Sequence, residues 1–303
     1  MKLKVLIHAS MTMAPMEKSD FTQIFRPLLK SQLPEEVCET SGLFFHKGRL
    51  WTHNDSGGDP ILYAVDMTTF GILQRITLAN AKNIDWEDLC SDGEYVYIGD
   101  FGNNRGSRKD LCVYKLPLAS IPAEGDATLS AEIIRFSYSD QTDFTEQKIN
   151  DFDCEAFFAT EEYLYLLTKS WKTGYTKLYR LSKAPGIYVA ESVNRFDSQG
   201  LVTGADYDRE NHVLVMVGYT KTIWWPFLYV VFDFDEAGER LHHHRFEMPQ
   251  LAWTQFEGIC FFDYGRCYIT AESNKTMASS VFEVDFRQWI DQALKPPFQM
   301  PPA

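Results

Sequence analysis

Five short motifs recur along the chain, and each begins with an acidic or hydroxyl residue that precedes a small or acidic residue and then apolar ones. Three of them begin with glutamate, at Glu87, Glu155 and Glu257, and the other two begin with Ser41 and Thr203. Carboxylates that meet in one place can bind a hard cation or act as general acids and bases. Turn formation alone does not require glutamate at these three positions, which favours a binding site.

The spacing of these motifs indicates a repeated unit. Successive motifs are about 50 residues apart, with one longer interval between Glu87 and Glu155, and a repeat near this length is typical of the blades of a β-propeller. A second marker, an apolar residue followed by an aromatic one, keeps the same pace through the long interval. Its occurrences are Leu62-Tyr63, Val113-Tyr114, Leu178-Tyr179, Leu228-Tyr229 and Val281-Phe282.

Each unit offers segments that resemble strands. Short, nearly continuous apolar runs lie between the two markers, which is typical of strands covered on both faces. Candidate outer strands follow in four units, at residues 72–78, 133–138, 187–190 and 240–246. The fifth unit lacks one. We expect residues 23–29 to complete the last blade and close the ring, because Pro27 is tolerable on a strand at the edge of a sheet.

The predicted fold is therefore an all-β propeller of five four-stranded blades, closed by an N-terminal strand. The alternative is a six-bladed ring with one degenerate blade in the long interval or near the N-terminus. We predict an N-terminal extension at residues 1–22, a single propeller domain at 23–286, and a C-terminal helix and tail at 287–303. The helix is expected to stop before Pro296 and Pro297.

Polar residues gather at two places in each unit, the start of the first strand and the end of the second. In a four-stranded antiparallel blade both places lie at the same face of the ring, near its axis, so these residues would share one mouth. The residues at the strand starts are Glu39, Ser41, Asp85, Glu87, Asp88, Asp153, Glu155, Thr203 and Glu257. The residues at the strand ends that we predict to bind a ligand are His53, Asn54, Asp55, Asp100, Asn103, Lys169, Tyr219 and Glu272.

A mouth of this kind favours one type of chemistry. Carboxylates at close range raise one another's pKa values unless a cation or hydrogen-bond donors offset the repulsion. Oxygen-rich sites bind Ca²⁺ or Mg²⁺ rather than zinc, so we predict one of these ions as cofactor. Lys169 is placed to pair with Glu155, and the candidate catalytic residues are Lys169, Glu87, Glu155 and Glu257. For any single position, a role in capping backbone N–H groups or in a turn is an equally good explanation.

Two further groups have more than one interpretation. Trp224, between the second and third strands of the fourth unit, would either pack against a neighbouring loop or form an aromatic wall for a sugar or another flat ligand. The run His242-His243-His244 has side chains that bind transition metals, but it falls on a predicted outermost strand whose alternate residues face opposite sides. We interpret this run as a solvated edge.

The phrases around the acidic motifs resemble a known group of propellers. ETSGL, DWEDL, DCEAF and QFEGI, each followed by a strand that ends in NDSGG, GDFGNN, TKS or AES, are similar to the SdiA-regulated and esterase-like phytase group over most of residues 35–286. The chain also resembles lactonase, paraoxonase and strictosidine-synthase-like propellers, which commonly hold a divalent cation in the central channel. The fourth unit departs from the pattern with Thr203. The resemblance implies that the metal-binding oxygens are those of Glu87, Glu155, Glu257, Asn54, Asp100 and Asn103.

The overall charge limits the partners. The chain has 42 acidic and 29 basic residues and a formal net charge of −13, which repels phosphate backbones, so we expect no nucleic-acid partner. No apolar run approaches the roughly 18 residues of a membrane span. The six cysteines form no C-x-x-C pair and are interpreted as buried thiols. Without a convincing signal peptide, we expect a cytoplasmic monomer, with a periplasmic or extracellular location as the alternative.

Three functions are compatible with these residues. The first is a non-catalytic propeller whose mouth holds a divalent cation together with a small molecule or a partner's peptide. The second is a metal-dependent hydrolase of lactones, esters or phosphoesters, in which the cation activates water and a mouth carboxylate acts as the base. The third is a glycosidase with two catalytic carboxylates. We therefore predict a site and leave its reaction open.

Overall fold

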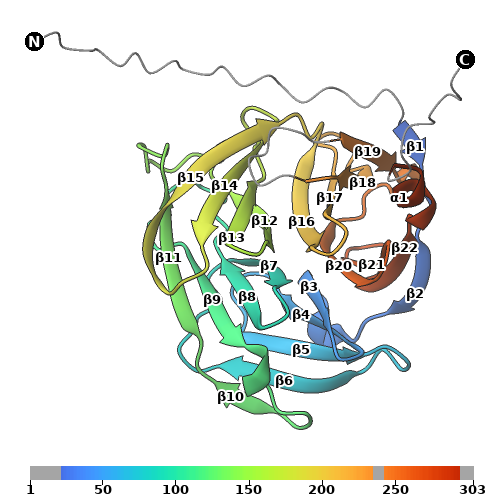
Figure 1. The fold of residues 1–303 in the computed structure, drawn as a ribbon, viewed down its shortest axis with the longest axis horizontal. Coiled ribbons are helices and arrows are strands. Elements are labelled where there is room, and N and C mark those ends of the chain that lie inside the picture. Colours follow the sequence, from blue (N-terminus) through green and yellow to red (C-terminus); the bar gives the residue numbers. More distant parts are fainter. Residues whose placement is uncertain (1–21, 235–241, 294–303) are drawn as a thin grey trace, which may run out of the picture.

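The computed structural model describes residues 22–234 and 242–293, and these residues form a β-propeller whose blades surround a common axis (Figure 1). The innermost strands meet near the centre of the ring. They are β3 (Thr40–His46), β7 (Trp86–Ser91), β12 (Cys154–Ala159), β16 (Leu201–Asp208) and β20 (Phe256–Asp263). The prediction of five blades is confirmed. The long interval contains loops and the short strand β10 (Ala127–Leu129), rather than a sixth blade.

Three further strands complete each blade from the axis outward. The first blade continues with β4 (Arg49–Asn54), β5 (Ile61–Asp66) and β6 (Ile72–Leu78), and the second with β8 (Tyr95–Asp100), β9 (Cys112–Pro117) and β11 (Glu132–Tyr138). The third continues with β13 (Tyr163–Thr168), β14 (Thr176–Ser182) and β15 (Gly186–Phe196), and the fourth with β17 (Val213–Tyr219), β18 (Pro226–Phe232) and β19 (His242–Glu247). The fifth continues with β21 (Arg266–Ala271), β22 (Ser280–Asp285) and the N-terminal strand β2 (Leu28–Gln32).

The N-terminal segment closes the ring, as predicted, but the closing strand begins later than expected. β2 pairs antiparallel with β22, with Leu29 opposite Phe282. Residues 22–24 form a separate strand, β1 (Thr22–Ile24), which pairs parallel with β19 of the fourth blade. Pro27 lies between the two strands because it lacks the N–H group that a ladder needs. The N-terminal segment therefore contacts two neighbouring blades.

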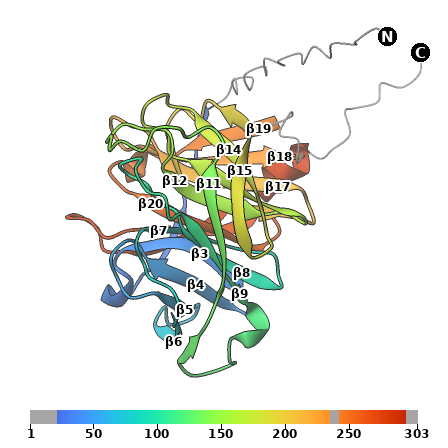
Figure 2. The same cartoon turned by 90° about the vertical axis from the view of Figure 1, so that its left-hand side faces the viewer.

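A contact that the sequence did not reveal joins the second and third blades. β11 and β15 pair in parallel, with Ile134 opposite Gly186, and so fuse the two blades into one eight-stranded sheet. The two strands run side by side along the outer edge of the ring (Figures 1 and 2). β15 extends well beyond the predicted residues 187–190, because it pairs with β14 as well as β11.

Apolar side chains fill the spaces between neighbouring blades, and each of the five spaces has its own core. The core between the fourth and fifth blades contains Val217 and Leu228 together with Ile269 and Phe282, all of which are buried. The core between the fifth and first blades contains Leu43 and Cys260, which confirms closure through side-chain packing. The apolar strands of the sequence are therefore covered on both faces.

Each innermost strand carries a β-bulge at its acidic or hydroxyl motif. The register shifts across Glu87, Glu155, Thr203 and Glu257 in four blades, and between Ser41 and Phe44 in the first. A bulge places two residues opposite one and re-aims a side chain. The repeated motif therefore marks the position at which every blade turns a side chain out of its regular alternation.

Asp88 ties three blades together at the axis. It is fully buried, and its Oδ2 accepts hydrogen bonds from the N–H groups of Phe157 at 3.1 Å and Ala205 at 3.3 Å, in the third and fourth blades. Its Oδ1 accepts the N–H of Leu89 at 2.8 Å. The sequence placed Asp88 among the residues of the mouth, but the structure makes it an internal brace. The Thr203 hydroxyl has a similar role, donating to the carbonyl oxygen of Phe256 at 2.5 Å.

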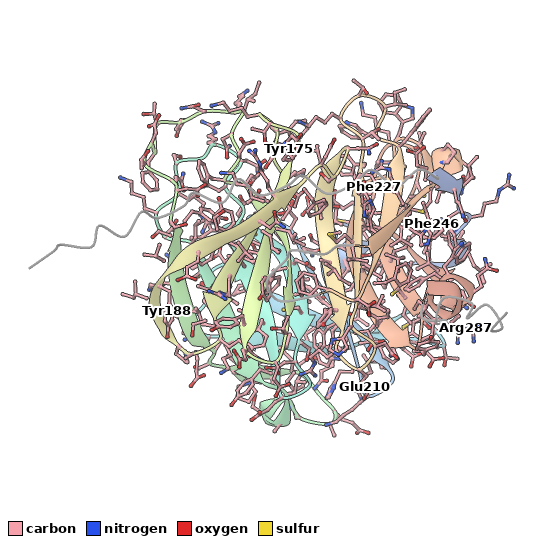
Figure 3. All side chains as sticks on the ribbon, turned by 45° about the horizontal axis from the view of Figure 1, so that its top comes forward. Tyr175, Tyr188, Glu210, Phe227, Phe246 and Arg287 are labelled. Carbon is pink, nitrogen blue, oxygen red and sulfur yellow. The ribbon has the colours of Figure 1, made fainter. Side chains whose placement is uncertain are left out.

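The two faces of the ring are set by the strand directions. Tyr175, in the loop before β14, lies at the face that also holds the end of β13, and Glu210, in the turn after β16, lies at the opposite face (Figure 3). A short helix, α1 (Arg287–Ala293), follows the last strand. Among the described residues, no helix combines the length and the apolar character needed to cross a membrane.

Candidate functional site

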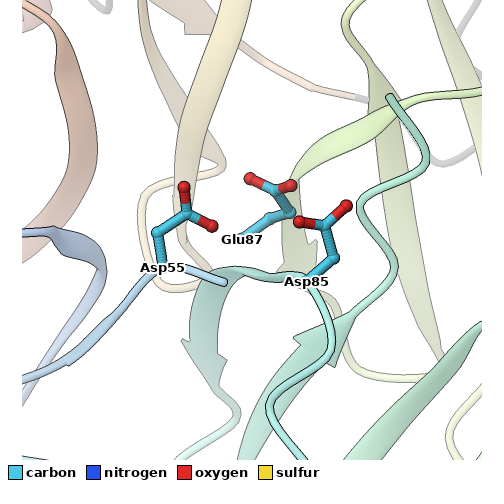
Figure 4. Close-up of side chains that lie close together, drawn as sticks. All are labelled: Asp55, Asp85 and Glu87. Carbon is cyan, nitrogen blue, oxygen red and sulfur yellow. The ribbon is translucent and has the colours of Figure 1, made fainter. Parts of the chain in front are cut away.

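Three carboxylates from the first two blades point toward one another at the mouth (Figure 4). Asp55 directly follows β4, Asp85 directly precedes β7, and Glu87 is the bulged residue of β7. One oxygen of each residue lies within 4.8 Å of the others. Glu87 is buried, whereas Asp55 and Asp85 are half-buried. The first two blades therefore bring Asp55 next to Asp85 and Glu87, which follow it by 30 and 32 residues in the sequence.

A second group shares Glu87 and extends into the third blade. Asp153 directly precedes β12, and Glu155 is the bulged residue of that strand. One oxygen each of Glu87, Asp153 and Glu155 lies within 4.8 Å of the others, and all three residues are buried. We call Asp55, Asp85, Glu87, Asp153 and Glu155 the carboxylate cluster. Its members come from three consecutive blades.

One oxygen of the cluster is buried without a partner. Asp153 is completely buried, and its Oδ1 accepts the N–H of Asn103 at 2.6 Å. Its Oδ2 has no hydrogen-bond partner among the described residues. Burying a polar atom without a compensating interaction costs free energy, and the cost is larger for a charged group. This oxygen is therefore an acceptor that a ligand would satisfy.

Gly102 leaves the space that the cluster occupies. It lies in the loop after β8, and its N–H donates to the carbonyl oxygen of Asp85 at 3.1 Å. A Cβ atom at this position would collide with Oε1 of Glu87 and Oδ2 of Asp85. The loop can pass this close to the two carboxylates only because residue 102 has no side chain.

Burial and mutual repulsion raise the pKa values of the cluster. Burial raises the pKa of Asp55 to about 7 and that of Asp85 to about 6, and the charge of Glu155 adds to both shifts. Burial, followed by the charge of Glu155, also raises the pKa values of Glu87 and Asp153 well above their usual range. Without a cation, the cluster therefore holds protons near neutral pH.

Lys169 lies at the edge of the cluster, as predicted from its position after β13. Its Nζ is 2.8 Å from Oε2 of Glu155, and both side chains are buried. Burial alone would lower the pKa of Lys169, but the charges of Glu155 and Glu257 outweigh it and raise that pKa. The ammonium group also lies 5.5 Å from the ring centre of Tyr219. Lys169 therefore stays charged and links the cluster to the fourth blade.

Glu257 and Glu272 lie on the fifth-blade side of the mouth, outside both groups of three. Burial raises the pKa of Glu257 well above its usual range, and Gln255 donates to its Oε1 at 3.2 Å. Burial and then the charge of Asp55 raise the pKa of Glu272 to about 8. The positive charge of Lys169 partly offsets the rise in both pKa values, which shows that Glu257 and Glu272 lie near the site although they are not members of the cluster.

The two asparagines that were predicted to bind metal have other partners in the structure. Oδ1 of Asn54 accepts the N–H of Glu39 at 3.3 Å, and its amide nitrogen donates to the carbonyl oxygen of Glu36. Oδ1 of Asn103 accepts the N–H of Arg108 at 2.9 Å, and its amide nitrogen donates to Phe152. Both amides therefore fix the loops that position the cluster.

Asp100 and His53 are also buried beside the mouth. Oδ1 of Asp100 accepts a charged hydrogen bond from Arg108 at 2.9 Å, whereas its Oδ2 is buried without a partner among the described residues. The ring of His53 packs edge-on against Trp86, and burial lowers the pKa of His53 to about 4. His53, which was predicted to bind a ligand, is therefore a neutral residue buried in the core.

The histidine run lies on the part of β19 that has no outer strand partner among the described residues, since β1 pairs with residues 245–247. His243 packs against Tyr229, with ring centres 5.4 Å apart, and His244 packs against Phe232 at 5.5 Å. Burial lowers the pKa of His244. His243 and His244 are half-buried, so these contacts cover only part of the predicted edge. The first two residues of the predicted strand, 240 and 241, lie outside the described part of the chain.

Asp85 and Asp153 are the cluster residues that we named at strand starts but did not predict as ligands. Each lies two residues before a bulged glutamate, in the phrases DWE and DCE. The same spacing in two blades was therefore the available signal that both aspartates accompany their glutamates into the mouth.

Comparison with known proteins shows the fold and no family. No protein-family model matches the sequence, and a search of curated proteins finds no match. One similar solved structure is an exo-β-1,3-galactanase from Phanerochaete chrysosporium, determined with galactose. It is 8% identical with a TM-score of 0.54, and the match covers 85% of this chain and 64% of the galactanase chain. A glucose dehydrogenase is 11% identical with a TM-score of 0.47, and the match covers 84% of this chain and 99% of the dehydrogenase chain. The RRP9 WD40 repeats are 10% identical with a TM-score of 0.46, and the match covers 87% of this chain and 99% of the RRP9 chain.

Proposed function

We propose that the carboxylate cluster binds a divalent cation, Ca²⁺ or Mg²⁺. The observation that supports this most strongly is Oδ2 of Asp153, a buried acceptor without a partner among the described residues, next to Glu87 and Glu155. A cation would satisfy that oxygen and offset the repulsion that raises the pKa of Glu87. Binding of the cation would thus offset the free-energy cost of burying carboxylates that repel one another.

The donor set favours a hard cation. All five members of the cluster offer carboxylate oxygens, and oxygen ligands suit Ca²⁺ and Mg²⁺, whereas zinc prefers histidine and cysteine. His53 is the histidine among the predicted site residues, and it packs in the core against Trp86. In this proposal Asp55, Asp85, Glu87, Asp153 and Glu155 hold the ion, and the predicted ligands Glu257, Asn54, Asp100 and Asn103 support the site from outside.

The finer assignments belong to the same proposal. The resemblance of the motifs to the SdiA-regulated and esterase-like phytase group agrees with an acidic mouth, and we extend the proposal to a small molecule or peptide that binds there beside the cation. Hydrolase and glycosidase chemistry is not part of the proposal, because no described feature distinguishes a catalytic carboxylate from a cation ligand in this cluster.

Thermal unfolding tests the proposal. We expect saturating Ca²⁺ or Mg²⁺ to raise the Tm of the metal-free protein by about 5 °C or more, because binding to the folded state alone stabilises it. The Glu87→Gln variant should lose this shift. In chelator it should be more stable than the parent, because glutamine neither repels the neighbouring carboxylates nor has to take up a proton on folding.

Glu161→Gln is the matched control, because Glu161 is exposed in the turn between β12 and β13. It should keep the full response to the cation. A Tm of the parent that is the same in chelator, Ca²⁺ and Mg²⁺ would contradict the proposal, and so would a normal cation response in Glu87→Gln.

A further inference from the structure

Three aromatic rings form a row that leads from the buried part of the mouth to solvent. Tyr219, at the end of β17, lies 5.7 Å from Trp224, and Trp224 lies 6.2 Å from Trp253, measured between ring centres. Tyr219 is 3% exposed, Trp224 is half-buried and Trp253 is 59% exposed. We call these three residues the aromatic row. The exposed indole of Trp253 therefore continues a buried row of rings to the surface of the protein.

Both tryptophans of the row have a backbone conformation that bulky residues rarely adopt. Trp224 has a φ of 50° and Trp253 a φ of 69°, in the left-handed region. A turn at either position would normally be made by glycine or asparagine. Strained residues persist where the surrounding structure holds them, and they concentrate at ligand sites. The backbone strain at these two positions therefore favours a role for the indole rings beyond packing.

Hydrogen bonds between three loops fix the row in place. The N–H of Trp224 donates to the carbonyl oxygen of Thr220 at 3.1 Å, and the N–H of Trp253 donates to the carbonyl oxygen of Trp224 at 3.0 Å. The side-chain amide of Asn274 donates to the carbonyl oxygen of Trp253 at 3.2 Å. The rings are thus preorganised, which lowers the entropic cost of binding a ligand.

The charges at the inner end of the row limit the class of ligand. Lys169 already occupies the neighbourhood of the Tyr219 ring, at 5.5 Å, so its ammonium group repels a second cation there. A neutral ligand with hydroxyl groups avoids this repulsion, and it can accept from Lys169 and Gln255 and donate to Glu257.

We propose that the aromatic row binds a neutral saccharide. The apolar face of a sugar ring would stack on Trp253 and Trp224, and its hydroxyl groups would reach Gln255, Glu257 and Lys169. This inference goes beyond the proposed cation site, and it does not require that a cation is bound. The row therefore defines a second binding surface next to the carboxylate cluster.

Calorimetric titration of the full chain with neutral oligosaccharides of glucose, galactose, mannose and xylose tests the inference, with choline and spermidine as cationic competitors. We expect at least one saccharide to bind, in chelator as well as in Ca²⁺. Trp253→Ala should weaken that binding by about tenfold or more, because it removes the exposed stacking face. Trp225→Ala is the matched control, since Trp225 is exposed in the loop of Trp224, and among the described ring contacts none joins it to the aromatic row.

Three results would overturn the inference: no binding by any saccharide of the panel at millimolar concentration, binding of choline or spermidine that Trp253→Ala removes, or an equal loss in Trp225→Ala and Trp253→Ala. The cation site is tested separately, because Trp253→Ala should keep the shift in Tm that Ca²⁺ produces. A parent protein that binds no saccharide of the panel but keeps its Ca²⁺ response would therefore reject the aromatic row alone.

Discussion

An Asp88→Ala variant is expected to be less stable than the parent by about 3–5 kcal/mol, as is typical when a buried network loses its acceptor. Asp88 accepts the N–H groups of Leu89, Phe157 and Ala205, which belong to the second, third and fourth blades. Alanine would leave all three donors buried without an acceptor and would open space on the axis. Chemical denaturation, followed by tryptophan fluorescence and circular dichroism, measures the difference in unfolding free energy.

Asp66→Ala is the matched control, because it removes the same number of hydrogen bonds from an exposed position. Asp66 also accepts three, from the N–H groups of Thr68 and Thr69 and the hydroxyl of Thr69, but in an exposed turn. Water replaces lost partners there, so this change should cost about 1 kcal/mol or less. If Asp88→Ala cost no more than Asp66→Ala, Asp88 would not be the internal brace described above.

The metal-free protein is expected to be more stable at pH 6 than at pH 8.5, by roughly 5 °C or more in Tm. The pKa of Asp55 is about 7, that of Asp85 about 6 and that of Glu272 about 8, in each case raised first by burial. These values lie above those of the unfolded chain. The stabilising contribution is therefore fully present below the unfolded pKa values, and it is lost as the pH rises through 6 to 8.

Two conditions sharpen this test. Below about pH 6 the buried His53 opposes the trend, because its pKa is lowered to about 4 and the unfolded chain takes up a proton first. In saturating Ca²⁺ the dependence between pH 6 and 8.5 should flatten or reverse, since protons and the cation compete for the same oxygens. A Tm in chelator that rises or stays constant from pH 6 to 8.5 would contradict the assignment of the cluster as a repelling set.

The blade pattern could be predicted from sequence because it is local and repeated. The apolar–aromatic pair lies on the third strand of every blade, for example Leu62 and Tyr63 on β5, and burial on both faces gives these strands a distinctive composition. The pairing of β11 with β15 was not predictable in this way. It joins the outer edges of two blades through a parallel register that no turn or motif specifies.

The acidic mouth was predictable as a region, whereas only some of its individual members were. Whether Asn54 or Asp55 faces the cluster depends on the hydrogen bonds that Asn54 makes with Glu36 and Glu39, which come from a different loop. Glu87 and Asp88 are adjacent, but the bulge sends Glu87 to the cluster and leaves Asp88 bracing the axis. Such choices follow from tertiary contacts rather than from residue type.

The most direct test of the cation site is a crystal structure of the protein grown with calcium, with anomalous differences recorded. The proposal predicts an anomalous peak at about 2.3–2.6 Å from carboxylate oxygens of Glu87 and Asp153. Saturating calcium with no peak among Asp55, Asp85, Glu87, Asp153 and Glu155 would contradict it.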